Sequence, residues 1–448
     1  MKKLALNLSV FICFLVIPIF VSAQNPLITN QFTADPTARV FEGKVYVYPS
    51  HDIVATPKHG RVGWFCMEDY HVFSSENLTD WTDHGVIVSQ NKVAWTDSAA
   101  YSMWAPECVF RNGKYYFYFP APAKNKTSGN GFSIGVAIAD KPYGPFVPES
   151  APIKNVHGID PNVFIDKDGQ AYLYWAQGNI YAAKLKNNML ELDGEPKVLG
   201  NLPDKGLKEG PYLFERKGIY YLTYPHVENK IERLEYATSN NPMGPFKFTG
   251  VIMDESISGC WTNHQSIIDY KGQWYLFYHN DDLSPNFDKS RSIRADSLFF
   301  NKDGTIQKVM PTLRGVGITQ ANKIIQLDRY SNTSSEGVSV GFLDTSNKMQ
   351  GWKVQLNQKN AWVRYNAVDF GKVKLATASA KTQSAQGGLL EIRIDKLDGT
   401  LLGSINVTPG SNWNLNKVSL ANFRSGKHDL FVILKDTQPV QIDWMRFE

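Results

Sequence analysis

The chain has 448 residues, which is more than one typical domain holds and predicts two domains. Its 47 lysine and arginine residues nearly balance 43 acidic residues, and no long basic run stands out. This balance argues against nucleic acid and anionic membranes as partners. Aromatic residues make up 13% of the chain, which suits carbohydrate contact and an all-β core equally well.

The first 23 residues have the pattern of a secretory signal peptide. Lys2 and Lys3 precede an apolar run that ends at Phe20, and the segment 21–23 supplies the cleavage site. The mature protein is therefore expected to begin near Gln24 and to be exported, to the periplasm or the medium. A signal anchor is the alternative, but the apolar run is short for a membrane span. No other stretch is long and apolar enough to cross a bilayer.

Three cysteines follow the predicted cleavage site, namely Cys66, Cys108 and Cys260. None belongs to a CxxC pair, and an odd number argues against a disulfide framework. Buried free thiols are predicted, with a single disulfide as the alternative.

One pattern recurs five times between residues 40 and 280. Each copy is an apolar segment, a glycine turn, and an aromatic segment with a tyrosine three residues after the glycine. The copies are 40-VFEGKVYVYPS-50, 109-VFRNGKYYFYFPA-121, 160-DPNVFIDKDGQAYLYW-175, 213-LFERKGIYYLTYPH-226 and 267-IIDYKGQWYLFYHN-280. The spacing between tyrosines suits one four-stranded propeller blade per copy. The sequence therefore predicts an all-β fold whose first domain, residues 25–320, is a five-bladed β-propeller. A β-sandwich array is the alternative.

Polar residues stand at the head of each copy. The heads are Asp35-Pro36, Ala105-Pro106-Glu107, Asp160-Pro161, Glu209-Gly210-Pro211 and His264-Gln265. Innermost propeller strands line the central axis, so carboxylates at three of these heads would share one cavity and push their pKa values apart. One acid would stay protonated while another stays ionised, as glycoside hydrolysis requires. The structural alternative is that Asp-Pro only initiates turns.

At these residues the chain resembles glycoside hydrolase family 43. The resemblance covers about residues 25–320. It rests on 33-TADPTARVFEGKVYVYPSHD-52, 103-MWAPECVFRNGKYYFYF-119, 158-GIDPNVFIDKDGQAYLYW-175, 207-LKEGPYLFERKGIYYLTY-224 and 263-NHQSI-267. By position it implies Asp35 as general base, Glu209 as general acid and Asp160 as the residue that tunes and orients the acid. No cofactor is required for this chemistry. The family's inverting mechanism predicts base and acid carboxyls about 6.5–9.5 Å apart.

The resemblance also implies residues that bind the sugar. His264 matches the family's axial histidine, although a lone strand histidine is often structural. Arg291 resembles the arginine that reaches towards the sugar and the tuning aspartate, and Arg294 is expected on the other strand face.

Trp104 and Phe65 are candidates for stacking on sugar rings, with a core role as the alternative. His51 is a candidate for lining the pocket. Its neighbours complete a contiguous Ser-His-Asp at 50–52, but a triad is defined by geometry rather than contiguity.

After about residue 320 the aromatic hairpins give way to short alternating strands. They read as a jelly-roll-like β-sandwich over residues 324–448. This part resembles carbohydrate-binding module family 6 in 326-QLDRY-330, 361-AWVRYNAVDFG-371, 391-EIRIDKLDGTLLG-403, 427-KHDLFVI-433 and 442-IDWMRF-447.

The resemblance makes Trp413 the sugar-stacking tryptophan of this module. Two positions depart from the family pattern, because Leu356 replaces a platform aromatic and Gln441 replaces an asparagine. Asp328 and Asp443 fall near the family's structural calcium position, and carboxylates suit that cation. Ordinary surface aspartates are the alternative.

Together these features predict an exported, inverting exo-glycosidase of plant polysaccharide or oligosaccharide. An α-L-arabinofuranosidase acting on arabinoxylan or arabinan is expected first. A β-D-xylosidase would use the same site, and endo-arabinanase is a third alternative. From a different class, the chain could be a non-catalytic carbohydrate-binding propeller. The sequence leaves the oligomeric state open.

Overall fold

The computed structural model describes residues 25–124, 131–284 and 286–448. The predicted signal peptide, residues 1–23, lies outside the described residues. Apart from two short 3₁₀ helices, Gln90–Lys92 and Lys348–Gln350, the regular structure is β-strand. The prediction of an all-β fold is therefore confirmed. Within the described ranges, no helix has the length and apolar character needed to span a membrane.

Five antiparallel sheets follow one another along the first part of the chain, and strands within each pair in chain order. The first sheet holds β1 (Ala34–Phe41), β2 (Lys44–Ser50), β3 (Asp69–Ser75) and β4 (Thr82–Ser89). The second holds β5 (Glu107–Arg111), β6 (Lys114–Pro122), β7 (Phe132–Ala139) and β8 (Val147–Pro148). The third holds β9 (Ile159–Ile165), β10 (Ala171–Gln177), β11 (Asn179–Leu185) and β12 (Lys197–Val198). The fourth holds β13 (Tyr212–Arg216), β14 (Ile219–Val227), β15 (Glu232–Ser239) and β16 (Lys247–Met253). The fifth holds β17 (Ser266–Tyr270), β18 (Gln273–Asn280) and β19 (Ser292–Leu298).

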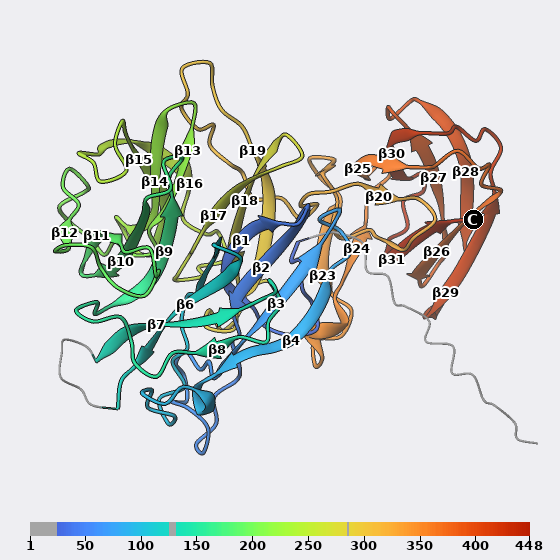
Figure 1. The fold of residues 1–448 in the computed structure, drawn as a ribbon. Coiled ribbons are helices and arrows are strands. Elements are labelled where there is room, and N and C mark those ends of the chain that lie inside the picture. The colour runs from blue at the N-terminus through green and yellow to red at the C-terminus, as the bar shows by residue number, and fades with distance from the viewer. Residues whose placement is uncertain (1–24, 125–130, 285) are drawn as a thin grey trace, which may run out of the picture.

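These five sheets close into a ring. The first strand of each sheet contacts the first strand of the next, and β17 contacts β1. Strands from β1 to β19 form the larger lobe in Figure 1. First strands that meet around one axis are the arrangement of a five-bladed propeller.

A hydrophobic cluster fills each interface between neighbouring sheets. The cluster that closes the ring joins Val45 and Val47 of β2 to Phe277 of β18. The repeated aromatic segments supply the bulk of the other four clusters. The recurring tyrosines thus hold the sheets together, which leaves the strand heads free for chemistry. Cys66, Cys108 and Cys260 are buried and free, which confirms the prediction of free thiols.

The second part of the chain forms two six-stranded sheets packed face to face. One holds β20 (Thr319–Gln320), β22 (Asn332–Thr333), β25 (Trp362–Asp369), β27 (Gly388–Ile394), β28 (Thr400–Val407) and β30 (Lys427–Leu434). The other holds β21 (Ile325–Gln326), β23 (Val338–Phe342), β24 (Trp352–Leu356), β26 (Thr377–Ser384), β29 (Gly410–Ser419) and β31 (Val440–Phe447). One apolar core lies between them. This is the predicted β-sandwich, the smaller lobe in Figure 1.

The sandwich begins slightly earlier than the sequence predicts. Strand β20, at residues 319–320, already pairs in parallel with β25. The two lobes also touch, because Arg329 Nη1 donates to the carbonyl of Pro26 at 3.3 Å.

Candidate active site

One cavity of about 100 Å³ gathers strand heads from around the ring. It brings together the predicted residues Asp35, Asp160, Glu209, His264, Arg291, Trp104 and Phe65. Trp64, Met67, Ala105, Ile159, Trp261, Thr262 and Asn263 complete its lining. Asp35 and Arg291, which are 256 positions apart, meet here. Asp35, Asp160, Glu209 and His264 lie at or just before the first strands of their sheets, and Arg291 precedes β19. The convergence that the sequence pattern predicts is therefore present.

Asp35 and Asp160 reach the cavity through the same backbone device. Their φ angles are 47° and 57°, in the left-handed region that residues other than glycine rarely adopt. The pairing register shifts beside each of them, between Ala34 and Thr37 and opposite Tyr174–Ala176. Such irregularities redirect a side chain at the end of a strand, and strain of this kind concentrates at functional sites.

Asp35 is held as an anion by a buried guanidinium. Arg291 Nη1 and Nη2 donate to its two carboxylate oxygens at 2.8 and 3.2 Å. The Ser50 hydroxyl donates to Asp35 Oδ2 at 2.6 Å. Burial alone would raise the pKa of Asp35. The opposing charge of Arg291, with smaller contributions from two histidines and Ser50, lowers that pKa to about 2.

His279 is one of those histidines, and the sequence patterns did not single it out. Its Nδ1 accepts the backbone N–H of Asp35 at 3.1 Å. Burial, followed by the charge of Arg291, lowers the pKa of His279 to about 3, so the imidazole is neutral and can accept this bond. His279 therefore fixes the strained backbone of the Asp35 head.

The partners of Arg291 differ from the prediction. Besides Asp35, its guanidinium pairs with Asp52, through Nε and Nη2 at 2.9 Å each, rather than with Asp160. Arg291 directly precedes β19 in the fifth sheet, which closes the ring against the first sheet, so Asp35 lies within reach. Arg294 lies on the other side, beside Asp282 and the ring of Tyr278, as the strand alternation predicts.

Replacing Arg291 with glutamine should move the acidic limb of the kcat/KM profile to higher pH. The native pKa of Asp35 is depressed, so the carboxylate is ionised throughout the range above about 2. Without the guanidinium, burial would raise that pKa and the base would be lost at a higher pH. The measurement is kcat/KM from acidic to neutral pH, with Arg294→Gln as a control for loss of a buried arginine. Superimposable acidic limbs for Arg291→Gln and the native enzyme would refute the charge assignment.

Asp160 holds the backbone beside Glu209. Its Oδ2 accepts the N–H of Gly210 at 2.9 Å. Gly210 has φ of 51°, and a Cβ there would lie 2.8 Å from the ring of Pro225 and 3.1 Å from His264 Nδ1, so only glycine fits. Burial, then the negative charge of Glu209, raises the pKa of Asp160 to about 7.

Glu209 is the carboxyl that keeps its proton. Burial raises its pKa well above the usual value, and the neighbouring carboxyl of Glu232 raises it further. Glu232 opens β15 and is buried. The sequence patterns missed it because the recurring polar residues precede or begin first strands, whereas Glu232 begins the third strand of its sheet.

His51 does not line this cavity, which corrects the expectation. Its Nδ1 lies 2.6 Å from Asp69, and its ring packs against His71. Strand alternation explains the difference, because Ser50 and Asp52 turn inward towards Asp35 and Arg291 while His51 turns outward. His51, Asp69 and His71 have donor atoms close enough for a metal ion. However, His71 Nδ1 also contacts a carboxylate oxygen of Asp83 at 2.9 Å, so contacts between histidines and carboxylates account for the cluster.

Aromatic rings form part of the wall of the same cavity. The ring of Phe65 lies 6.2 Å from that of Trp104 and 6.3 Å from that of Trp261, and the Arg291 guanidinium lies 4.8 Å from it. The indole Nε1 of Trp104 is buried without a hydrogen-bond partner among the described residues. Trp64 and Trp261, which the patterns missed, extend this apolar wall.

The sandwich presents a different surface. Leu356 belongs to its core, so that position offers no sugar platform. Trp413, on β29, is partly exposed, with the ammonium of Lys381 5.6 Å from its ring centre. Gln441 lines a cavity of about 490 Å³ beside Gly410 and Ser411. Sugar binding at Trp413 stays a prediction.

Calcium at Asp328 and Asp443 also stays a prediction. Asp328 Oδ1 is buried without a hydrogen-bond partner among the described residues, which would favour an added cation. Yet Lys381 donates to Asp443 Oδ2 at 2.8 Å, and Arg329 donates to Asp328 Oδ2 at 3.3 Å. Each carboxylate therefore already has one oxygen paired with a positive side chain.

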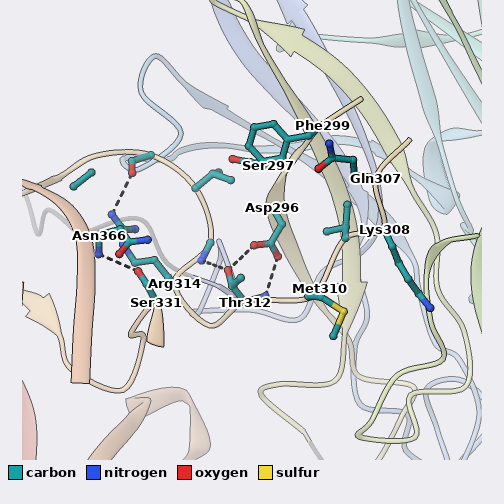
Figure 2. A pocket seen from close by; sticks show the side chains of 15 residues that line it. Asp296, Ser297, Phe299, Gln307, Lys308, Met310, Thr312, Arg314, Ser331 and Asn366 are labelled. Carbon is teal, nitrogen blue, oxygen red and sulfur yellow. Dashed lines mark hydrogen bonds between the residues drawn. The ribbon is translucent and has the colours of Figure 1, made fainter. Parts of the chain in front are cut away.

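A cavity of about 460 Å³ lies where the last propeller sheet meets the sandwich (Figure 2). Asp296 is the one carboxylate among the described residues lining it, and it accepts hydrogen bonds from Tyr278 and Thr312. Figure 2 shows the carboxylate of Asp296 turned towards Thr312. One satisfied carboxylate cannot supply both an acid and a base, so this cavity is not the catalytic one.

Comparison with known proteins agrees with this geometry. Residues 23–306 match the model of Glycosyl hydrolases family 43, and residues 331–448 match that of Carbohydrate binding module (family 6). A xylosidase/arabinosidase 43A of Humicola insolens is 35% identical over 336 residues, covering 64% of this chain and 99% of that protein. An arabinoxylan arabinofuranohydrolase of Bacillus subtilis (strain 168) is 28% identical over 473 residues, covering 92% and 90%.

Solved structures give the same result. A β-xylosidase/α-arabinofuranosidase from a compost microbial metagenome, in complex with xylotriose, is 36% identical with a TM-score of 0.57, and the match covers 64% of this chain and 98% of that one. The Bacillus subtilis arabinoxylan arabinofuranohydrolase structure is 26% identical with a TM-score of 0.56, covering 95% and 97%. With its matching family model, closed ring and cluster of carboxyls, this chain belongs to family 43 of the glycosyl hydrolases.

Proposed function

We propose that the protein is an inverting exo-glycosidase in which Asp35 is the general base and Glu209 the general acid. The supporting observation is that two carboxyl groups lining one cavity have pKa values shifted in opposite directions. Arg291 holds Asp35 ionised, whereas burial and Glu232 keep Glu209 protonated. In the reaction, Asp35 takes a proton from water as that water attacks the anomeric carbon, and Glu209 donates its proton to the leaving oxygen.

Asp160 serves the acid in this proposal. Its bond to the Gly210 N–H fixes the peptide next to Glu209, and therefore the direction of that side chain. Its own negative charge, when present, opposes ionisation of Glu209. This is the tuning and orienting role that the sequence resemblance implies.

Exo action is supported by the size of the cavity. Ligand sites usually measure roughly 300–1,000 Å³, whereas this cavity measures about 100 Å³. That space suits one terminal sugar unit rather than a polymer threaded through. Phe65 and Trp104 offer faces for stacking, and the unpaired Trp104 N–H offers a donor to a sugar hydroxyl.

We favour α-L-arabinofuranosidase activity on arabinoxylan or arabinan. Two relatives named arabinoxylan arabinofuranohydrolase match 92% of this chain, which includes both the propeller and the sandwich. β-D-Xylosidase is the second candidate, because relatives of higher identity over the propeller are named xylosidase, alone or together with arabinosidase. The exported location expected from residues 1–23 suits an enzyme that meets plant polysaccharide outside the cell.

The deciding experiment incubates residues 24–448 with arabinoxylan and, separately, with unbranched xylo-oligosaccharides, and identifies the sugar released. Arabinose from the polymer is expected. Xylose from the oligosaccharides without arabinose from the polymer would replace this assignment with β-xylosidase. Sugar binding without any release from these substrates or from arabinan would favour the non-catalytic propeller.

A further inference from the structure

Glu232 has a hydrogen-bonding arrangement that the catalytic assignment does not yet use. It is 1% exposed, and its Oε2 accepts the backbone N–H of Asn263 at 2.6 Å. Its Oε1 is buried, and no N–H or hydroxyl group among the described residues donates a hydrogen bond to it. The carboxyl of Glu209 lies beside this side chain, within hydrogen-bonding reach when one of the two groups is protonated. Buried polar atoms require partners, so the contact with Glu209 has to carry a proton.

Two carboxyl groups in such contact cannot both ionise without strong repulsion. The Asn263 N–H stabilises the ionised form of Glu232, and no comparable donor to the Glu209 carboxyl is found in the described parts of the chain. Burial raises the pKa of both carboxyl groups, that of Glu232 to about 8; the Asn263 N–H and the contact with Glu209 oppose the rise at Glu232, whereas the contact with Glu232 adds to the rise at Glu209. Glu232 therefore gives up its proton first, and the last proton of the pair stays on Glu209.

Other charged groups face the same pair. Asp160 and Asp35 lie close enough to raise the pKa of Glu232. Arg291 is the cation that opposes this effect at Glu209, and His264 lines the same cavity. Arg291 is engaged by Asp35 and Asp52, and no salt bridge joins Glu232 to a cation among the described residues. Besides the Asn263 N–H, Glu209 is the neighbouring group that can relieve its charge.

We propose that Glu232 is a positioning residue that shares the Glu209 proton and so keeps the general acid protonated to higher pH. This inference rests on the proposed function, in which Glu209 is the acid. Above the pKa of Glu232, which is about 8, two facing carboxylates remain after Glu209 has protonated the leaving oxygen, and their repulsion favours recovery of a proton from water. The proton that Asp35 takes from the attacking water returns to solvent, so the cycle closes without a further reactant.

The test is the pH dependence of kcat/KM for Glu232→Gln. The amide preserves shape but carries no charge, so the basic limb should move to lower pH by at least about one unit, a tenfold change in proton affinity. Below about pH 5, where Glu209 is protonated in both proteins, the two kcat/KM values should agree within about threefold. A basic limb that stays in place would overturn the proposal.

Glu235→Gln is the matched control. Glu235 is a fully buried glutamate three residues further along β15, on the opposite face, where it pairs with His226 and Arg233. Its loss should lower the melting temperature without moving the basic limb. An equal shift in both variants would show a general effect of losing a buried charge and would also overturn the proposal.

A measurement on the unsubstituted protein covers the case in which Glu232→Gln does not fold. Infrared spectra across a pH series should show a protonated carboxyl band that persists above the pKa of Glu232, about 8, and that is lost from this range in Glu209→Gln. Absence of that band in the native protein would contradict proton sharing. If Glu209→Gln retained full activity, the proposed function itself would fail, which is a separate outcome from an unmoved basic limb in Glu232→Gln.

Discussion

Replacing Glu209 with glutamine should lower kcat/KM on arabinoxylan oligosaccharides by about 10²–10⁴-fold. The glutamine keeps the size of the side chain but has no acidic proton for the leaving oxygen. A leaving group that departs as a stable anion needs no such proton. The same variant should therefore retain much more of its activity on aryl glycosides with acidic phenols.

The measurement is kcat/KM across a series of aryl glycosides whose phenols become steadily more acidic. The kcat/KM of the native enzyme should depend weakly on the acidity of the phenol, and that of Glu209→Gln should depend on it steeply. Uniform loss across the series would contradict the role of Glu209 as acid. Melting temperature controls for a folding defect, since Glu209 also contacts Glu232.

Replacing Asp35 with asparagine should reduce kcat/KM by a similar factor of about 10²–10⁴ on every substrate, whatever the leaving group. The amide can still accept from Ser50, but it can neither neutralise Arg291 nor take a proton from water. A phenol that leaves more easily does not restore the activation of the attacking water. Rescue by acidic phenols would show that the acid and base assignments are reversed.

Azide provides the complementary assay for this variant. It attacks without first losing a proton, so it should bypass the missing base and give a glycosyl azide of inverted configuration. Azide should leave Glu209→Gln unaffected on unactivated substrates, because protonation of the leaving oxygen is still missing. Rescue of Glu209→Gln and not of Asp35→Asn would contradict both assignments.

Much of this site could be predicted because propeller geometry converts a sequence repeat into a spatial one. Asp35, Asp160 and Glu209 head first strands, so knowing the repeat is enough to bring them together. The aromatic positions after each glycine are equally regular, and they form the clusters between sheets.

Other contacts are not encoded by the repeat. Arg291 meets Asp35 because the fifth sheet closes against the first, and only the closed ring shows which carboxylates the guanidinium reaches. His279 lies on the second strand of the fifth sheet and Glu232 on the third strand of the fourth, where a polar residue has no distinguishing signal. The expectation that His51 lines the pocket came from the family resemblance, whereas strand alternation turns this side chain away while Ser50 and Asp52 face the site.

The sandwich illustrates the same limit in another way. Its fold follows from strand alternation, but the environment of Asp443 depends on a lysine from the neighbouring strand β26. Matching Asp443 to a calcium position by sequence does not reveal that Lys381 donates a hydrogen bond to it.

The most direct test of the account is the anomeric configuration of the first product formed. Proton NMR should follow hydrolysis of an aryl α-L-arabinofuranoside, or an aryl β-D-xyloside if that is the preferred substrate, before the free sugar equilibrates. Direct attack by water that Asp35 activates predicts the inverted anomer first, β-arabinose or α-xylose respectively. Initial appearance of the retained anomer would require a covalent intermediate and would contradict Asp35 as a general base.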